Sequence, residues 1–366
     1  MVRAVAALLV ILFHIQNALG IQVRYAPVRD IFSAGHRGVD LFFVLSGFII
    51  AYSHRKDLGR QDRLGNYLFN RFARIYPAVW IMSALAIVVY MVGFSTPDKA
   101  DKLTPGAIVA SAFLLPQVAV PLVNVTWTLT YEIFFYFLFG ILIINFRIGL
   151  AIFILWQMAV VTVALTDVNL GLAGYYLRAV CLDFSVGLAC AWWIHQMRKE
   201  VLSSAVWVGL LISGVLGFGV GMWFDATAQW SAIPCALGAG VIIVSLVVLE
   251  QMKHLRVPDL IVKLGGASYS VYLVHFSVIQ MLSTLLRRIG VPATDILFLI
   301  YLPAGVLAGM AFDHWVDRPI QRRLQQLKPM LLQATSRASS RTSVGKAGSR
   351  GAFSASAGAS SDQVAS

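Results

Sequence analysis

The sequence is poor in charged residues and in cysteine. Only 13% of its 366 residues are Asp, Glu, Lys or Arg, roughly half the fraction typical of soluble domains, which excludes a water-soluble globular protein. The three cysteines, Cys181, Cys190 and Cys235, lie in apolar runs without a C-x-x-C pair, so we expect neither a disulfide framework nor a zinc site. A Gly-rich phosphate loop is also absent. We therefore predict no metal centre and no permanently bound cofactor.

What the sequence does contain is a series of long apolar runs. Hydrophobic residues make up 58% of the chain and gather in stretches long enough to cross a membrane. We predict an all-α integral membrane protein whose roughly ten transmembrane helices form one bundle. The spans are expected at residues 1–20, 38–53, 75–94, 128–146, 148–166, 174–195, 205–224, 231–249, 268–286 and 295–315. The apolar stretch 107–122 contains Pro116 and Pro121, which favours a short peripheral or re-entrant element.

The net charge of +12 indicates membrane topology rather than nucleic acid binding, because the basic residues lie between the apolar runs. If the N-terminus is cytoplasmic, the inner loops and the C-terminal segment carry twenty Lys and Arg residues and the outer loops carry seven. This bias predicts that both termini are cytoplasmic. From about residue 334 the chain is rich in Ser, Ala, Gly and Arg, and we predict that 334–366 is a disordered cytoplasmic tail without a second domain.

Two polar residues interrupt the first apolar run. Arg3 and His14 are eleven residues apart, about three helical turns, so both side chains leave the same helix face roughly 16 Å apart along the axis. Such side chains are costly in hydrocarbon unless a partner or a cavity receives them. The pattern indicates a helix that lines a site. The alternative is that Arg3 snorkels to the cytoplasmic surface while His14 hydrogen-bonds inside the bundle.

A second polar pair precedes the second span. If the helix already includes residue 36, His36 and Asp40 face each other at a four-residue spacing. A carboxylate beside an imidazole orients it, which suits a general base. The alternative is an interfacial pair that caps the span. In the same run, Gly47 allows close packing against a neighbouring helix.

Further polar residues stand at the third and fourth spans. Arg71 and Arg74 share a helix face and would form a cationic site suited to phosphates, although arginines that only set topology would give the same pattern. Glu132 follows Trp127 at the start of an aromatic span, where a glutamate is costly unless it is paired or functional. Near the C-terminal end, we favour structural hydrogen-bond anchors for His275 and Asp317.

Together these motifs resemble the membrane acyltransferase-3 family, integral membrane O-acyltransferases that modify bacterial glycans, and within it the stand-alone proteins of exopolysaccharide acetylation. The matching pieces occur in family order over residues 1–320, which we expect to form the membrane acyltransferase domain. They are Arg3-Ala-Val-Ala-Ala-Leu-Leu-Val…His14, Gly38-Val-Asp-Leu-Phe-Phe-Val-Leu-Ser-Gly-Phe48, Arg71-Phe-Ala-Arg74-Ile-Tyr-Pro, Trp127-Thr-Leu-Thr-Tyr-Glu132, Ser268-Tyr-Ser-Val-Tyr-Leu-Val-His275 and Asp317-Arg-Pro319.

The resemblance implies a multi-pass protein of the bacterial plasma membrane that uses acyl-CoA, usually acetyl-CoA, as co-substrate. Arg3, Arg71 and Arg74 would bind this donor from the cytoplasm. His14 would be the general base that activates a sugar hydroxyl, while an acyl-histidine intermediate stays open as a variant. Glu132 or Asp40 would orient His14 or bind the sugar.

The resemblance also implies a glycan or lipid-linked saccharide as acceptor and membrane lipid as surroundings, with no nucleic acid partner. We assign His36, Trp127 and Tyr131 to the acceptor side, at the outer ends of the second and fourth spans with Asp40 and Glu132. Ser46, His275 and Asp317 are candidates for a structural or functional role. The acceptor sugar and the oligomeric state are not encoded in these motifs.

Two other classes of protein share some of these features. A secondary transporter or flippase of a glycolipid or small metabolite would also carry charges inside its spans, but the sequence shows no internal repeat. An inactive membrane scaffold would not need this many polar residues within apolar runs.

Overall fold

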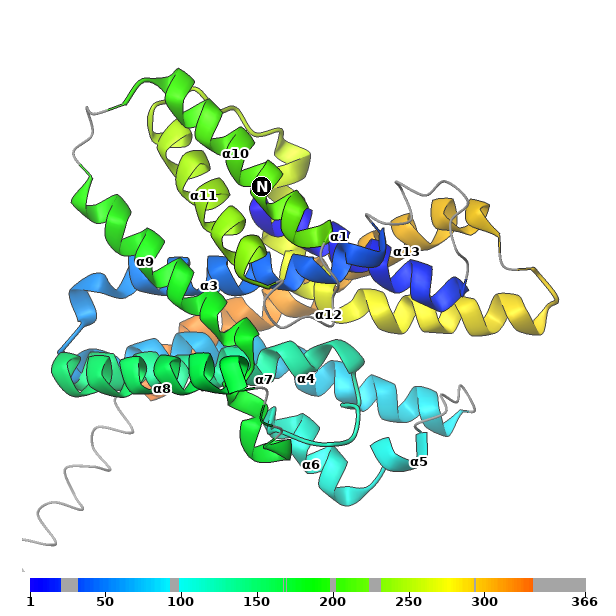
Figure 1. The fold of residues 1–366 in the computed structure, drawn as a ribbon. Helices are drawn as coiled ribbons and strands as arrows, with labels where there is room; N and C mark the ends of the chain where they lie inside the picture. The colour runs from blue at the N-terminus through cyan, green and yellow to red at the C-terminus, as the bar shows by residue number, and fades with distance from the viewer. Residues whose placement is uncertain are drawn as a thin grey trace, which may run out of the picture.

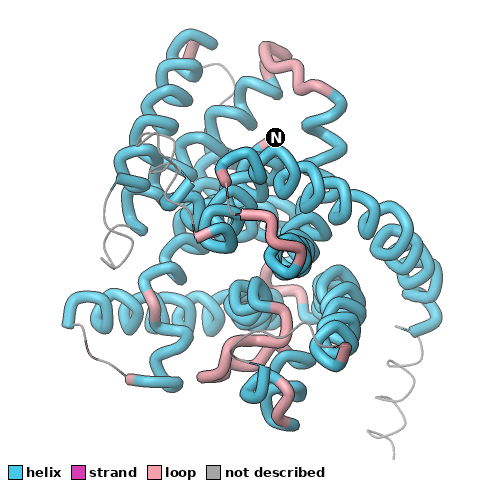
Figure 2. Tube along the Cα trace, turned by 90° about the vertical axis from the view of Figure 1, so that its right-hand side faces the viewer, coloured by secondary structure: helices cyan, strands magenta, loops and turns pink. Residues whose placement is uncertain are grey.

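The computed structural model describes residues 1–20, 32–92, 99–166, 168, 170–197, 202–223, 232–292 and 294–331. Within these ranges the secondary structure is helical and no strand occurs (Figures 1 and 2). The described residues include 10 helices that are long and apolar enough to cross a membrane. The prediction of an all-α protein with ten spans is therefore confirmed. The predicted tail 334–366 lies outside the described residues.

Ten α-helices form the spans. They are α1 (Val2–Leu19), α3 (Gly38–His54), α4 (Leu64–Met91), α7 (Trp127–Ile144), α8 (Phe146–Thr166), α9 (Leu182–Gln196), α10 (Ser204–Trp223), α11 (Ala232–Gln251), α12 (Asp259–Arg288) and α13 (Phe298–Phe312). A π-helical turn, Asp313–Asp317, extends α13 into a helix that reaches Leu331.

The segment between α4 and α7 contains two short helices, α5 (Lys99–Lys102) and α6 (Pro105–Phe113). The Thr104 side chain caps α6 by accepting a hydrogen bond from the Ala107 N–H at 3.3 Å. Leu114 ends α6 in the left-handed conformation, with φ of 53°. Neither helix is long enough to span a membrane, as expected for the proline-interrupted stretch 107–122.

Helix α1 lies in the centre of the bundle and packs against α3 and α12 (Figure 1). Its small and branched residues Ala4, Ala7, Ile11 and Ile15 recur every three or four positions and bury one stripe against α12 and α13. Helices α10 and α11 form a hairpin inclined to the others, while α4, α7 and α8 form the opposite side (Figure 1). This arrangement surrounds α1 with the helices that carry the other polar motifs.

Two glycines allow α3 and α9 to touch backbone to backbone. A Cβ at Gly47 would overlap the carbonyl oxygen of Phe184, and a Cβ at Gly187 would overlap that of Val44. Small residues at helix contacts are a general device of membrane proteins, because lipid supplies no hydrophobic force that holds helices together. The close packing expected at Gly47 is thus confirmed, and α9 is its partner.

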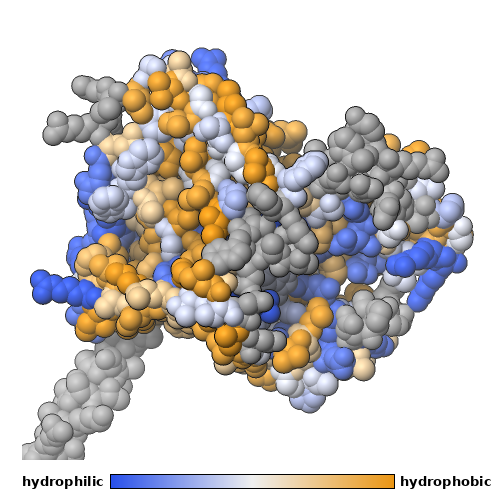
Figure 3. All heavy atoms as spheres, in the orientation of Figure 1, coloured by the Kyte–Doolittle hydropathy of each residue, from blue (hydrophilic) through white to orange (hydrophobic). Residues whose placement is uncertain are grey.

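The outward surfaces of the helices are apolar. Leu155 of α8 and Leu216 of α10 are each 65% exposed, which fits contact with lipid tails rather than water. Figure 3 shows hydrophobic residues over the inclined α10–α11 hairpin and hydrophilic residues gathered at the two ends of the view. The chain is a multi-pass membrane protein; the cytoplasmic placement of both termini stays a prediction.

Candidate active site

Five helices meet around a pocket inside the bundle. Unfilled space of about 580 Å³, counting the opening, lies between them. The lining residues come from α1, α3, α4, α7 and α12, and they are Arg3, Val39, Phe42, Phe43, Ser46, Arg74, Thr128, Leu129, Glu132, Ser268, Tyr269 and Tyr272. Motifs separated by more than 200 residues in the sequence are therefore brought together here.

Glu132 is the acidic residue of this pocket. Its Oε1 atom accepts hydrogen bonds from the Ser46 hydroxyl at 2.9 Å and from the Tyr136 hydroxyl at 2.5 Å. Tyr136 lies one turn further along α7, whereas Ser46 reaches across from α3. The carboxyl group is thus fixed between two helices.

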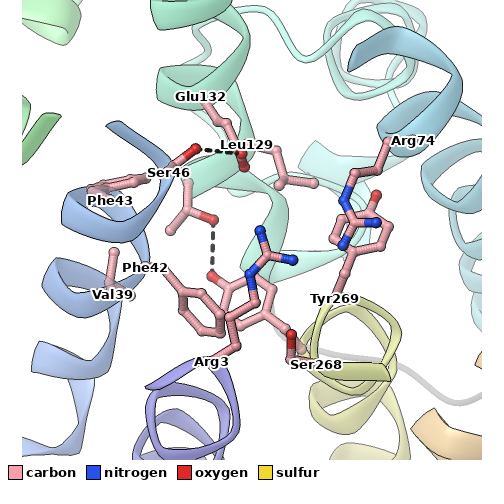
Figure 4. Close-up of a pocket in the computed structure, with 12 residues that line it drawn as sticks. Arg3, Val39, Phe42, Phe43, Ser46, Arg74, Leu129, Glu132, Ser268 and Tyr269 are labelled. Atoms are coloured by element: carbon pink, nitrogen blue, oxygen red, sulfur yellow. Dashed lines mark hydrogen bonds between the residues drawn. The ribbon is translucent and has the colours of Figure 1, made fainter. Parts of the chain in front are cut away.

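Arg3 and Arg74 extend into the same space from α1 and α4, beside Glu132, Ser268 and Tyr269 (Figure 4). The Arg74 guanidinium also lies over the Tyr269 ring, 5.6 Å from its centroid, a cation–π contact. Two guanidinium groups and one carboxylate leave the pocket with an excess of positive charge. Planar forks of N–H donors in such a place suit phosphate oxygens.

Arg71, three residues before Arg74, does not line the pocket. Its Nη2 atom donates to Nε2 of His54 at 3.0 Å, while Asp57 is 2.8 Å from the other ring nitrogen of His54. The Arg71 guanidinium also lies 5.7 Å from the centroid of the Tyr136 ring. The two predicted donor arginines of α4 therefore separate: Arg74 enters the pocket with Arg3, and Arg71 lies behind Tyr136.

His14 lies three turns along α1 from the pocket, among aromatic rings. Its ring centroid is 5.3 Å from that of His275 and 4.9 Å from that of Phe276. The Tyr272 ring, 5.8 Å from His275, lines the pocket on the other side. Arg3 and His14 therefore both face α12, as the eleven-residue spacing predicts, and Tyr272 both lines the pocket and contacts His275.

His275 has a defined hydrogen-bond state. Its Nδ1 atom is 3.1 Å from the Val271 carbonyl oxygen, which requires the proton on Nδ1. The Nε2 atom is then an acceptor, and it is buried without a hydrogen-bond partner among the described residues. His275 therefore has an unpartnered acceptor nitrogen, and its ring lies 5.3 Å from that of His14.

The expected contact between His36 and Asp40 is wrong. Residues Ala34–Arg37 form a 3-10 turn and α3 begins only at Gly38. Arg37, three residues before Asp40, therefore faces Asp40 in place of His36, which is four residues before it. Asp40 pairs with Arg37 at 3.7 Å, and its carboxyl lies beside that of Asp183 on α9. The Nδ1 atom of His36 is 3.1 Å from the Ser33 carbonyl oxygen.

The expected grouping of Glu132 with His36 and Asp40 is also wrong, because Glu132 lies with Arg3 and Arg74 and neither of the other two lines the pocket. The physical reason is depth: Glu132 is five residues into α7, about 7 Å along the axis. His36 packs instead against Phe13, with ring centroids 5.4 Å apart.

Trp127 and Tyr131 lie at the start of α7, outside the pocket. The Tyr131 ring stacks on Tyr175 with centroids 4.8 Å apart and contacts Trp127 edge to face at 6.0 Å.

Asp317 accepts hydrogen bonds from Ser270 at 3.1 Å and from Gln321 at 3.2 Å. Gln321 also donates to the Ala73 carbonyl at 2.8 Å, so Asp317 helps to join α12, α13 and α4, as favoured for an anchor.

Several residues of the site were not assigned from the sequence. Ser268 and Tyr272 share one face of α12 at a spacing of four, and Tyr136 follows Glu132 by four. These spacings were visible signals. The buried Asp183 also gave a signal, because a carboxylate inside the predicted span 174–195 is costly without a partner, but that partner, Asp40, is 143 residues away in the sequence. No group of three or more potential metal ligands occurs within the described ranges.

Comparison with known proteins identifies relatives of this chain. The family model described as "Acyltransferase domain", of the Acyl_transf_3 type, matches residues 1–313. The exopolysaccharide production protein ExoZ of Rhizobium meliloti is 29% identical over 80% of this chain and 91% of its own length. Acyltransferase MdmB of Streptomyces mycarofaciens is 23% identical over 90% and 92%.

A third relative is longer. The peptidoglycan O-acetyltransferase OatA of Listeria monocytogenes is 24% identical over 87% of this chain, which spans 55% of OatA. No solved structure matches the chain. The family match over residues 1–313 covers the segment that carries the pocket and the two histidines.

Proposed function

The chain belongs to the acyltransferase-3 family and is a membrane O-acyltransferase, and from this premise we propose that it transfers the acetyl group of acetyl-CoA to a hydroxyl of a cell-surface or lipid-linked glycan such as an exopolysaccharide. One observation carries the proposal. The pocket with Arg3, Arg74 and Glu132 lies inside the bundle, and its wall residue Tyr272 contacts His275, which in turn contacts His14.

The proposed orientation places Met1 and the residue 331 end at the cytoplasm of a bacterial plasma membrane, because the loops on that side carry most of the basic residues. Acetyl-CoA then reaches the pocket from the cytoplasm. Arg3 and Arg74 bind phosphate oxygens of the donor by charge-assisted hydrogen bonds. Arg71 adds positive charge behind Tyr136 and contributes less to donor binding than Arg74.

His14 is the proposed general base. Its neutral imidazole removes the proton from the acceptor hydroxyl while the alkoxide oxygen attacks the thioester carbonyl carbon. Collapse of the tetrahedral intermediate breaks the carbon–sulfur bond, and the leaving thiolate takes the proton back from His14. The products are an acetyl ester and CoA thiol. In the alternative route His14 itself accepts the acetyl group first.

The remaining candidates take supporting roles in this proposal. Glu132 positions a donor or acceptor group through the oxygen network with Ser46 and Tyr136. Asp40 acts as a positioning residue, since it is buried with Arg37 and Asp183 away from the pocket. His36, Trp127 and Tyr131 lie near the outer ends of their helices and form part of the acceptor entrance.

The test is transfer of labelled acetyl from acetyl-CoA to endogenous glycan in membranes that contain the protein at matched expression. We expect label with the wild type, loss by at least a hundredfold in His14→Ala, and a raised KM for acetyl-CoA in Arg74→Ala. Arg147→Ala serves as a control, because this exposed cation lies at the start of α8 outside the pocket.

Full activity of His14→Ala would disprove the base assignment, and equal effects of the Arg74 and Arg147 variants would disprove the donor site. Absence of transfer in the wild type, together with uptake of a glycolipid, would favour a transporter or flippase. Acid quenching during turnover followed by mass spectrometry separates the two routes, since only the two-step route leaves an acetyl group on His14.

A further inference from the structure

One buried titratable group has no part in the transfer step proposed above. His275 lies on α12 with 0% of its surface exposed, and it faces both α1 and α13. A Cβ added at Gly305 of α13 would lie 3.4 Å from the His275 Cβ and 4.0 Å from the Ile11 side chain of α1. An imidazole inside a membrane helix is costly unless it has a partner or a function.

Only one nitrogen of His275 has a hydrogen-bond partner. Nδ1 is 3.1 Å from the carbonyl oxygen of Val271, one turn earlier in α12, so Nδ1 carries the proton and Nε2 carries the lone pair. Nε2 is buried and unpartnered among the residues that the structure describes. The predicted role of a hydrogen-bond anchor accounts for Nδ1 alone. A buried acceptor without a partner is unfavourable, and a catalytic role is one of the explanations for such an atom.

His14 is within reach of this acceptor. The two ring centroids are 5.3 Å apart and the rings are inclined by 43°. When one nitrogen of each ring points at the other, this separation brings the two nitrogens to about 3 Å, the length of a hydrogen bond. The last side-chain torsion of histidine has a broad minimum, so a rotation of the His14 ring is enough to align them.

The other ring neighbours of His14 are Phe13 and Phe276, and a phenyl ring does not select which nitrogen of an imidazole carries the proton. The two carboxylates expected to orient His14 are engaged elsewhere. Glu132 accepts hydrogen bonds from two hydroxyl groups, and Asp40 pairs with an arginine. A general-base histidine needs a partner that holds the proton on its other nitrogen, as the carboxylate of a catalytic triad does.

We propose that His275 is the positioning residue of the catalytic base, with its Nε2 atom accepting a hydrogen bond from an N–H of His14. The lone pair of the other His14 nitrogen is then free for the acceptor hydroxyl. When His14 takes the hydroxyl proton, the hydrogen bond to His275 becomes charge-assisted and stabilises the imidazolium. The proton passes on to the leaving thiolate, and His275 keeps its own proton on Nδ1 throughout. This inference rests on the proposed function, because it assigns the partner of the base in that reaction.

Two substitutions separate this role from that of an anchor. In His275→Gln the amide oxygen lies where Nε2 was, so an acceptor for His14 remains. In His275→Asn the shorter amide still donates to the Val271 carbonyl but does not reach His14. In the acetyl-transfer assay we expect His275→Gln to keep kcat within about fivefold of the wild type and His275→Asn to lose about a hundredfold, with KM for acetyl-CoA unchanged in both. An active His275→Asn and an inactive His275→Gln would identify an anchor and overturn the proposal.

The tautomer of His14 is measured independently of activity. The full chain, with histidine labelled by a heavy nitrogen isotope, is reconstituted in lipid, and solid-state NMR reports which ring nitrogen carries the proton. The His14 signals are those missing in His14→Ala. We expect one neutral tautomer of His14 in the wild type and in His275→Gln, and a mixture of both in His275→Asn. A mixture in the wild type would overturn the proposal even if neither variant folded.

The inference and the proposed function fail in different ways. Absence of acetyl transfer in the wild type, or full activity of His14→Ala, would refute the proposed base and with it the role of His275. Loss of transfer in His14→Ala together with wild-type kcat in both His275 variants would refute the role of His275 and leave the proposed function in place.

Discussion

Ser46 and Glu132 define the pocket at the scale of single residues. The serine hydroxyl comes from α3 and the carboxyl from α7, and their 2.9 Å hydrogen bond joins the two helices across the site. A hydroxyl in the middle of an apolar span gains little from its surroundings unless it has such a partner. The presence of Ser46 in the Gly38–Phe48 motif is therefore explained by its hydrogen bond to Glu132, which belongs to the motif at the start of α7.

Ser46→Ala should lower kcat/KM for acetyl transfer about tenfold, because a hydrogen bond to a charged group contributes about 1.5 kcal/mol or more. Ser46→Thr keeps the hydroxyl and should retain most of the activity. The measurement is the initial rate in membranes with quantified protein. If the alanine variant were as active as the threonine variant, the hydrogen bond to Glu132 would have no part in transfer.

Arg74 gives a second prediction at this scale. Arg74→Lys keeps the charge but loses the planar fork and the stacking on Tyr269, so we expect KM for acetyl-CoA to rise about tenfold while kcat changes less. Arg71→Lys should have a smaller effect on KM, since Arg71 lies behind Tyr136. Titration of acetyl-CoA at saturating acceptor measures both, and a larger effect at Arg71 would contradict the assignment.

The sequence predicted which polar residues line the site better than it predicted which residues they contact. The cost of a polar group in a membrane helix singles out Arg3, His14, Glu132 and Arg74 without a structure. Contacts between neighbouring turns, such as that of Glu132 with Tyr136, follow from helix spacing. Contacts across the bundle do not, because they depend on how helices far apart in sequence pack.

At the scale of elements, the start of α3 illustrates a limit of helical spacing. The prediction that His36 faces Asp40 assumed a regular α-helix, but the 3-10 turn Ala34–Arg37 rotates the chain before Gly38. Gly38 also needs to be small there, because a Cβ would approach the Ala6 carbonyl oxygen to 2.6 Å. Packing of this turn against α1 decides the local geometry, and local sequence preference does not reveal it.

The contact between α3 and α9 gives a prediction for stability. Gly47→Leu should destabilise the protein by about 3 kcal/mol or more, because the added side chain collides with the backbone of Phe184. Gly219→Leu is the control: Gly219 lies in the membrane helix α10 with nothing within 4 Å of an added Cβ, so it should be neutral. Thermal unfolding in detergent compares the two variants. A stable Gly47→Leu variant would show that α3 and α9 can separate.

At the scale of the whole molecule, the number and order of the spans followed from hydropathy, because each span must satisfy its backbone hydrogen bonds internally. The inclination of the α10–α11 hairpin (Figure 1) did not follow, nor did the central place of α1. The hairpin's inclination and the position of α1 depend on which helices carry small residues at the same depth in the membrane. This is a property of pairs of helices, and the hydropathy of single segments does not reveal it.

The orientation in the membrane can be tested with single cysteines introduced after replacement of Cys181, Cys190 and Cys235. Asp62→Cys lies between α3 and α4 and Thr294→Cys between α12 and α13, both at exposed positions. In intact spheroplasts an impermeant thiol reagent should label the cysteine at 294 at once and the cysteine at 62 only after lysis. The reverse order would invert the proposed topology and place the donor pocket on the outer side.

Tyr272 has a consequence for the membrane itself. Its hydroxyl is held by the Val125 carbonyl at 3.1 Å and lies 2.9 Å from the Thr128 hydroxyl, and its ring lines the charged pocket and contacts His275. If the acyl group passes from the pocket to the imidazoles as proposed, an aromatic ring held at that point would limit the room for water along the same route. The same residue would then help the bilayer to stay sealed against ions during transfer.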